Sequence, residues 1–264
     1  MNNKTEATPT SRPLIFVTND DGFYAYGIRN LIDIVRQYGD VVAVAPERSE
    51  SGMSHAITIR KPLRLKKISS EEGFEFYRCN GTPVDCVKIG LDRVVTRKPD
   101  ILVSGINHGS NSSVSVFYSG TMAAALEGCI NKITSIGFSL LDHSSNANFA
   151  PSLKYVETIF STILKNGLPR NVCLNVNIPN VSSDEIKGIK VCRQTDGIWK
   201  EEFDRRLDPY NEEYFWLTGD YKNLEPDKTD TDEWALANNY ISVVPVKIDI
   251  TSYDTLEVLQ GLNK

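Results

Sequence analysis

Short apolar segments alternate with helical patterns along the first two thirds of the chain, and this alternation constrains the fold most. Most of these segments are β-branched and continuously apolar, as in strands buried on both faces. The predicted strands are residues 14–18, 41–45, 74–79, 100–104, 134–140 and 172–178. The predicted helices between them are residues 27–38, 83–95, 121–130 and 152–164. This repeat predicts an α/β fold, with a doubly wound, mostly parallel sheet and right-handed crossovers.

Less regular segments complete the prediction. Residues 56–59 and 63–65 alternate weakly, which predicts a hairpin around Lys61-Pro62. Residues 105–119 are polar, and a long loop is expected there. The last part of the chain is predicted to form a strand at 189–193, a short helix at 233–238, a strand at 240–246 and a terminal helix at 253–262.

The composition is that of a globular protein and excludes several classes of partner. The 264 residues are 41% hydrophobic and 24% charged, with a net charge of −5. Because basic blocks and aromatic–basic interleaving are absent, no nucleic-acid polymer is expected as a partner. No apolar run is long enough for a bilayer, so no membrane contact is expected. Five scattered cysteines without CxxC spacing indicate reduced thiols, and we therefore expect a cytoplasmic protein.

Composition divides the chain into four parts. Residues 1–12 are polar and predicted to be a disordered tail, and residues 13–194 form the α/β core. Residues 195–232 mix aromatic and charged side chains without a helical period, which predicts an extended hairpin or arm for subunit contact. The alternative is a surface excursion folded back on its own domain. Residues 233–264 are expected to return to the core.

The strand at Leu14–Thr18 ends in Asn19-Asp20-Asp21-Gly22, which suggests a cation site. Adjacent carboxylates repel each other and lose hydration on burial, so a compensating charge is needed. The alternative is an Asx-turn followed by a helix N-cap. Polar clusters at 48–54 and 104–111 also follow strands, and the carboxyl ends of parallel strands meet at one sheet edge. Their oxygen donors favour Mg²⁺, Mn²⁺ or Ca²⁺ over structural zinc. His108 is expected to be a hydrogen-bonded bystander.

A turn of small residues, Ser119-Gly120-Thr121, opens the alanine-rich helix. Backbone N–H groups and the positive dipole end at a helix N-terminus suit a phosphate. The alternative is that Ser119 or Thr121 only caps the helix. Beside an oxygen-rich cation site, the turn predicts a phosphate cradle.

Several motifs occur in a fixed order along the chain. They are Asn19-Asp20-Asp21-Gly22, Ala45-Pro46-Glu47-Arg48 with Ser51-Gly52, Asn80-Gly81-Thr82-Pro83 with Asp85-Cys86-Val87, Val103-Ser104-Gly105-Ile106-Asn107 with Gly109 and Asn111, Tyr118-Ser119-Gly120-Thr121, and Thr229-Asp230-Thr231-Asp232 with Ile241-Ser242-Val243-Val244-Pro245. Together they resemble the SurE (stationary-phase survival protein) phosphatases, which act as 5′-nucleotidases. The resemblance covers nearly everything after the tail.

This resemblance implies a Rossmann-like core and a divalent metal cofactor. It also implies release of inorganic phosphate from a nucleoside monophosphate substrate. A protruding C-terminal hairpin would be exchanged between subunits of a homodimer or homotetramer. Carried over to this chain, the metal ligands are Asp20, Asp21, Ser51 and Asn107.

We therefore expect a metal-dependent phosphomonoesterase that hydrolyses nucleoside 5′-monophosphates. The cation would bind phosphate oxygens and lower the pKa of a water molecule. Asp20 or Asp21 would act as general acid or base, and the sequence does not decide between them. The residues assigned to phosphate binding are Asn19, Gly52, Asn111, Ser119, Gly120 and Thr121.

Three other functions stay open at this point. A haloacid-dehalogenase-like phosphatase would use Asp20 as a covalent nucleophile, but it expects an Asp-x-Asp sequence that is missing after the first strand. A nucleotide-binding oxidoreductase needs a Gly-x-Gly-x-x-Gly turn there, whereas this turn is acidic. A non-catalytic metal or nucleotide sensor meets no contrary feature, and turnover of p-nitrophenyl phosphate would distinguish it from an enzyme.

Overall fold

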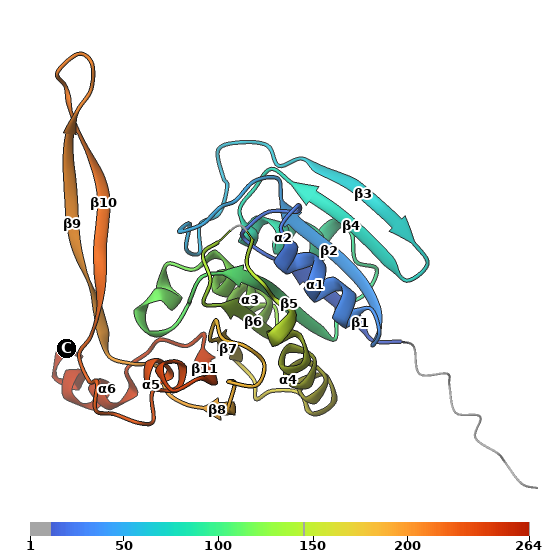
Figure 1. Cartoon of the computed structure of the whole chain (residues 1–264). Helices are drawn as coiled ribbons and strands as arrows, with labels where there is room; N and C mark the ends of the chain where they lie inside the picture. Colours follow the sequence, from blue (N-terminus) through green and yellow to red (C-terminus); the bar gives the residue numbers. More distant parts are fainter. Residues whose placement is uncertain (1–11, 145, 264) are drawn as a thin grey trace, which may run out of the picture.

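The computed structural model describes residues 12–144 and 146–263, and it contains a nine-stranded sheet flanked by helices (Figure 1). Apart from Arg12, the predicted tail lies outside the described residues. The strands are β1 Leu14–Thr18, β2 Asp40–Pro46, β3 Leu65–Glu71, β4 Phe74–Cys79, β5 Ile101–His108, β6 Thr134–Leu140, β7 Val172–Ile178, β8 Gly188–Val191, β9 Gly197–Leu207, β10 Glu213–Asn223 and β11 Tyr240–Lys247. The helices are α1 Tyr26–Val35, α2 Pro83–Arg93, α3 Gly120–Ile130, α4 Leu153–Asn166, α5 Asp232–Ala237 and α6 Tyr253–Leu259, with a 3₁₀ turn η1 at Ser113–Phe117.

The sheet has the order β3-β4-β2-β1-β5-β6-β7-β11-β8. Strand β1 pairs in parallel with β2 on one side and with β5 on the other. The direction in which the chain adds strands therefore reverses beside β1, and ligands of open α/β sheets bind at such a switch point. The predicted doubly wound, mostly parallel sheet is confirmed; among the described residues of this sheet, only the β3–β4 and β7–β11 pairs are antiparallel.

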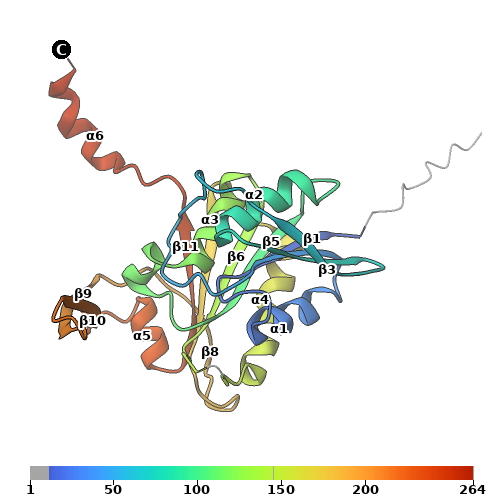
Figure 2. The same ribbon diagram turned by 90° about the horizontal axis from the view of Figure 1, so that it is seen from above.

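Helices cover both faces of the sheet, as Figure 2 shows from above. Helices α1 and α4 pack on one face and α2 and α3 on the other. Strand β1 serves both layers because its side chains alternate: Ile15 and Val17 join the cluster under α1 and α4, and Phe16 joins the cluster under α2. Every residue of β1 is buried, which explains its continuous apolar sequence.

The predicted hairpin around Lys61-Pro62 is wrong, because residues 56–63 form no strand. The antiparallel partner of β4 is instead β3, and the chain reverses at Glu72-Gly73. Gly73 has φ +69°, a left-handed conformation that glycine adopts without strain. Strand β3 is an edge strand whose side chains are mostly exposed, so it carries no apolar alternation.

The predicted loop at 105–119 is also partly wrong, since β5 continues to His108 and η1 follows. Asn107 and His108 pair with Ser139 and Leu140 of β6 after an irregularity in the register. Backbone pairing with β6 thus keeps Asn107 and His108 in a strand, although polar side chains of this kind do not predict one. The extension carries Asn107 to the carboxyl edge of the sheet.

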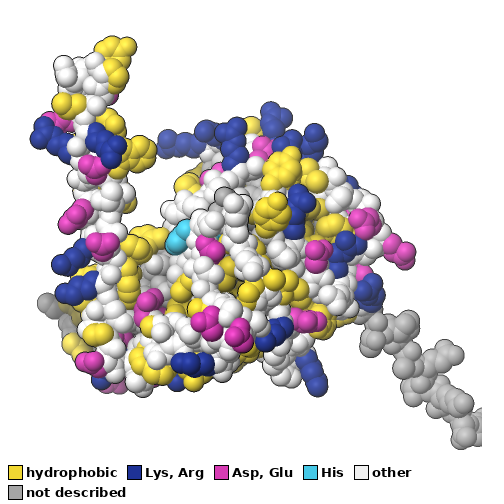
Figure 3. Space-filling view, viewed as in Figure 1, with side chains coloured by type: hydrophobic (Ala, Val, Ile, Leu, Met, Phe, Trp, Pro, Cys, Tyr) yellow, Lys and Arg dark blue, Asp and Glu magenta, His cyan; other side chains and the backbone are white. Residues whose placement is uncertain are grey.

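The predicted extended hairpin is confirmed as β9 and β10, which form a separate two-stranded sheet projecting from the body (Figure 1). Figure 3 shows hydrophobic side chains along its length. Exposed members include Phe203, Tyr210, Phe215, Trp216 and Leu217. Helix α6 has no buried residue and extends away from the sheet (Figure 2). None of the helices in the described parts of the chain combines enough length with enough apolar character to cross a bilayer.

Candidate functional site

A cavity of about 290 Å³ opens at the carboxyl ends of β1 and β5, beside the switch point. It collects side chains from all three predicted clusters and from the turn before α3. Its lining residues are Asp20, Ser51, Gly52, Asn107, His108, Gly109, Ser110, Asn111, Ser115, Tyr118, Ser119, His143 and Trp199. Six of the ten predicted site residues are among them. The other four are Asn19, Asp21, Gly120 and Thr121, which lie within two residues of Asp20 or Ser119 in the chain.

Asp20 meets the N-terminus of α3. The Thr121 N–H donates to Asp20 Oδ2 at 3.1 Å, and the Thr121 hydroxyl donates to Asp20 Oδ1. Gly120 permits this approach, because a Cβ there would lie 2.9 Å from the Asp20 Cβ. Asp20 therefore occupies the positive end of the helix dipole, where the sequence predicted a phosphate. Thr121 is fully buried and contacts the carboxylate rather than the cavity.

The loops after β1, β2 and β5 are tied together around the two carboxylates. The Glu50 N–H donates to the Asp20 carbonyl at 2.8 Å. The His108 N–H donates to Asp21 Oδ2 at 3.1 Å. Asn19 closes the turn after β1 by donating from Nδ2 to the Gly22 carbonyl at 2.9 Å. These bonds fix Asp20 and Asp21 between β2 and β5.

Burial makes this carboxylate pair electrostatically costly. Burial and the charge of Asp21 raise the pKa of Asp20 to about 6, although the hydrogen bonds from Thr121 act in the opposite direction. Burial also raises the pKa of Asp21, against the lowering effects of the His108 N–H and the nearby imidazoles of His108 and His143. Bound cations relieve this cost of keeping both groups ionised.

The residues present fit a hard divalent cation. Asn107 Nδ2 donates to the Gly109 carbonyl at 2.8 Å, which leaves its Oδ1 for a ligand. Asn19 Oδ1 is buried without a hydrogen-bond partner among the described residues. No group of three or more His, Cys, Asp or Glu side chains within residues 12–144 and 146–263 is placed to hold a metal. A cation here would therefore depend on the two carboxylates and on neutral oxygens, as Mg²⁺ and Mn²⁺ sites do.

A buried polar network, missed in the sequence, positions Asn111. Asn177 Oδ1 accepts the Asn111 N–H at 2.7 Å, and Asn175 Nδ2 donates to the Asn111 carbonyl at 2.8 Å. Asn111 Nδ2 in turn donates to Ser139 Oγ at 2.7 Å. The sequence does contain a sign of this network: Asn175 and Asn177 stand two residues apart in the otherwise apolar β7, so both side chains lie on the same face of the sheet.

Other lining residues were also missed. His143 lies in the loop after β6 and approaches Gly109, where a Cβ would lie 2.2 Å from its ring. Tyr118 was noted only as part of a turn, and Trp199 only as part of the arm. Nothing in the local sequence places His143 or Trp199 at the site, because their neighbours there are distant along the chain.

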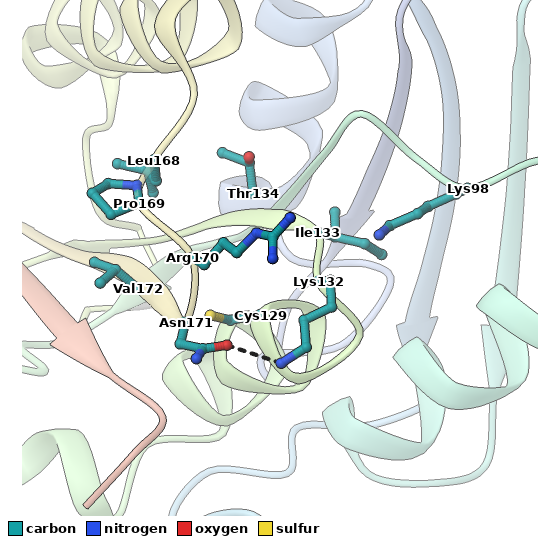
Figure 4. Close-up of a pocket in the computed structure, with 10 residues that line it drawn as sticks. All are labelled: Lys98, Cys129, Lys132, Ile133, Thr134, Leu168, Pro169, Arg170, Asn171 and Val172. Carbon is teal, nitrogen blue, oxygen red and sulfur yellow. Dashed lines mark hydrogen bonds between the residues drawn. The ribbon is translucent and has the colours of Figure 1, made fainter.

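A larger cavity of about 520 Å³ lies at the opposite edge of the sheet, where β6 and β7 begin (Figure 4). Lys98 and Arg170 extend toward it from opposite sides, and Lys132 donates to Asn171 Oδ1 at 2.9 Å. It contains none of the predicted site residues. The carboxyl-end cavity is therefore the candidate site, as expected for a doubly wound sheet.

Fold and site together define a Rossmann-like α/β protein with an oxygen-lined ligand cavity at the carboxyl ends of its parallel strands. Residues 15–201 match the family model described as "Survival protein SurE". The chain is 54% identical over 252 residues to a protein of Christiangramia forsetii named "5'-nucleotidase SurE", covering 95% of this chain and 96% of the relative. A Flavobacterium johnsoniae protein of the same name is also 54% identical, over 249 residues that cover 94% of this chain and 96% of that protein.

A solved structure agrees with these sequence relationships. The crystal structure of the SurE protein from Aquifex aeolicus superposes with a TM-score of 0.82 at 38% identity, covering 96% of this chain and all of that one. This chain belongs to the SurE family.

Proposed function

We propose that this protein is a metal-dependent phosphomonoesterase that hydrolyses nucleoside 5′-monophosphates to nucleoside and phosphate. The observation that carries the proposal is the pair of the buried Asp20 and the half-buried Asp21, held by Thr121 and His108 beside a polar cavity at the switch point. The names of the relatives support the nucleotide substrate. Family membership disfavours the covalent phosphatase and sensor alternatives.

The proposed metal ligands are Asp20, Asp21, Ser51 and Asn107. A bound Mg²⁺ or Mn²⁺ would neutralise phosphate charge and lower the pKa of a nearby water molecule. Asp20, Ser51 and Asn107 all line the cavity, whereas Asp21 is not among the lining residues and accepts the His108 N–H of β5. We assign the proton transfer to one of the two carboxylates, and Asp20 is the one that reaches the cavity.

The remaining residues divide into those that contact phosphate and those that hold the site. Ser119 Oγ accepts the Met122 N–H at 3.0 Å, so its proton stays available for a phosphate oxygen. Gly52 and Asn111 line the cavity and are assigned the same role. Thr121 and Gly120 instead orient Asp20, and Asn19 shapes the turn.

Phosphate release from nucleoside 5′-monophosphates tests this proposal. The protein is stripped of metal by chelation and dialysis, and Mg²⁺, Mn²⁺ or Ca²⁺ is then added back. We expect no activity after chelation and recovery with Mg²⁺ or Mn²⁺. Asp21→Asn should lose most of this activity, whereas the matched control Asp33→Asn, on the exposed face of α1, should keep it. Full activity after exhaustive chelation, or no phosphate release with any metal, would contradict the proposal.

We also propose that the hairpin joins subunits of a homodimer or homotetramer. Many large apolar side chains of the hairpin are exposed, including Phe203, Phe215 and Trp216, and clusters of exposed apolar side chains often mark interaction surfaces. We further propose that the protein is located in the cytoplasm, a reducing compartment, because all five cysteines are free and buried.

A further inference from the structure

Two aromatic side chains connect the candidate site to a second cavity. This neighbouring cavity, of about 360 Å³, is lined by Tyr118, Trp199, Leu217, Thr218 and Gly219. Tyr118 and Trp199 also line the cavity that contains Asp20. Their side chains are 53% and 42% exposed, so both rings offer free surface at this junction.

Backbone contacts hold Tyr118 in place. Ser54, in the loop after β2, donates from its N–H to the Tyr118 carbonyl at 3.1 Å and from its hydroxyl to the Phe117 carbonyl at 2.6 Å. Ser119, the next residue, caps α3. These bonds hold the Tyr118 backbone directly beside Ser119, which lines the cavity that contains Asp20.

Trp199 is held through the base of the hairpin. Asp232 is fully buried and accepts the Ser113 N–H of η1 at 2.8 Å and the Thr195 N–H before β9 at 2.9 Å. One carboxylate thus joins η1, which leads to Tyr118, to the strand that carries Trp199. The Trp199 ring also packs edge-on against Tyr221 at 5.9 Å between centroids. These contacts hold the Trp199 ring and the Tyr118 backbone in place without a ligand.

The second cavity offers flat apolar surface and few free polar groups. Its one hydroxyl on the hairpin, Thr218 Oγ1, already donates to the Glu202 carbonyl at 2.6 Å. Leu217 adds an apolar wall, and Gly219 has no side chain to fill the space. Such a cavity suits a planar ring bound by stacking, with little reading of its hydrogen-bonding edge.

We propose that Tyr118 and Trp199 form the platform on which the nucleobase stacks while the phosphate lies beside Asp20. This inference rests on the proposed function and deepens it. It makes the base of the hairpin a part of the substrate site. It also makes the preference for nucleotides over other phosphomonoesters a matter of stacking, with modest discrimination among bases.

Paired substrates test the platform. Each protein is assayed with AMP and with ribose 5-phosphate, which has the same sugar and phosphate but no base. Trp199→Ala should raise KM for AMP about fivefold or more, because stacking a base on an aromatic side chain contributes roughly 1–3 kcal/mol. Kinetics with ribose 5-phosphate should change less than about twofold. Tyr118→Ala should behave alike, and Trp199→Phe should restore most of the affinity for AMP.

Trp216→Ala is the matched control, since Trp216 is an exposed tryptophan on β10 that lines neither cavity; it is assayed at a concentration at which light scattering gives the same mass as for the wild type. It should leave the ratio of the two substrates unchanged. Thermal unfolding of each variant shows whether the hairpin still folds. If the wild type releases phosphate from neither substrate, the proposed function fails. If it hydrolyses both but Trp199→Ala affects them equally, or affects neither, the platform is refuted and the function stands.

Fluorescence gives a readout that does not depend on turnover. The chain has three tryptophans, and only Trp199 lines the site. With Mg²⁺ present, a non-hydrolysable phosphonate analogue of AMP should quench tryptophan emission in the wild type but not in Trp199→Phe, after correction for nucleotide absorption. Ribose 5-phosphate should quench neither protein. Equal quenching of both proteins by the analogue would place the base elsewhere and overturn the proposal.

Discussion

Replacing Thr121 by valine would test how the buried carboxylate pair is organised. The change keeps the shape of the side chain and removes the hydroxyl that donates to Asp20 Oδ1. Asp20 is 4% exposed, so water cannot easily replace the lost donor. Asp20 would become less well oriented and harder to ionise, because the hydrogen bonds from Thr121 lower its pKa.

The magnitude follows from the geometry. A hydrogen bond to a charged group contributes about 1.5–3 kcal/mol, and about 1.4 kcal/mol corresponds to a tenfold change in affinity. The Thr121 N–H stays bonded to Asp20 Oδ2 at 3.1 Å, so part of the orientation survives. We therefore expect Mg²⁺ to bind Thr121→Val about ten- to thirtyfold more weakly than the wild type.

Calorimetric titration of Mg²⁺ into the stripped protein measures this loss, with Thr121→Ser as the control that keeps the hydroxyl. The sign of the pH dependence follows from the raised pKa of Asp20. Removing a bond that favours the ionised form raises that pKa further, so the loss should be larger at pH 6.5 than at pH 8.5. Wild-type affinity in Thr121→Val, or an equal loss in Thr121→Ser, would refute the role of this hydroxyl.

Three further predictions concern separate parts of the molecule. Asp21→Asn should reduce kcat on the order of 10²-fold through loss of a charge beside the cation, whereas His108→Ala should stay near the wild type in the same assay; the reverse order would show that the roles are misassigned. The pKa of Glu127 is lowered to about 2 by its hydrogen bond with His55, so this carboxylate stabilises the fold above pH 4.5 and the contribution is lost as the pH falls toward 2. Glu127→Gln should therefore cost about 2 kcal/mol in denaturant unfolding at pH 7 but little at pH 2, and an equal cost at both would contradict this origin. Replacing residues 208–213 at the hairpin tip with a short Gly-Ser linker should give a smaller species in light scattering, and an unchanged mass would refute the subunit role.

The parts of the fold that the sequence predicted are those fixed by local chemistry. Strand β1 and its acidic turn were found because four buried apolar residues run directly into polar ones. Helix α2 was located from Thr82 and Pro83, and its Thr82 side chain indeed caps the Asp85 N–H. Ser119, at the start of α3, lines the cavity, whereas the Thr121 N–H at the same helix end donates to Asp20, so the predicted phosphate cradle stays a prediction.

The parts that were missed depend on partners far along the chain. Strand β3 has no apolar pattern because it lies at an edge, and its pairing with β4 decides its structure. The partner of Thr121 is Asp20, which lies 101 residues earlier. Local sequence could indicate a helix cap at this turn but could not show that the helix end meets a carboxylate. The asparagines of β7 likewise acquire a role only when β5, β6 and β7 are side by side.

The buried Asp232 carboxylate connects the long hairpin to the part of the cavity that Tyr118 and Trp199 form. It accepts the Ser113 N–H of η1, which precedes Tyr118, and the Thr195 N–H, which precedes the strand that carries Trp199. A partner subunit that binds the hairpin would therefore restrict the motion of the aromatic surface on which the base stacks. Specific activity toward AMP should then fall on dilution below the dissociation constant of the assembly, while that toward ribose 5-phosphate stays level. Specific activity toward AMP would thus depend on the oligomeric state, because Asp232 connects the hairpin to the substrate site.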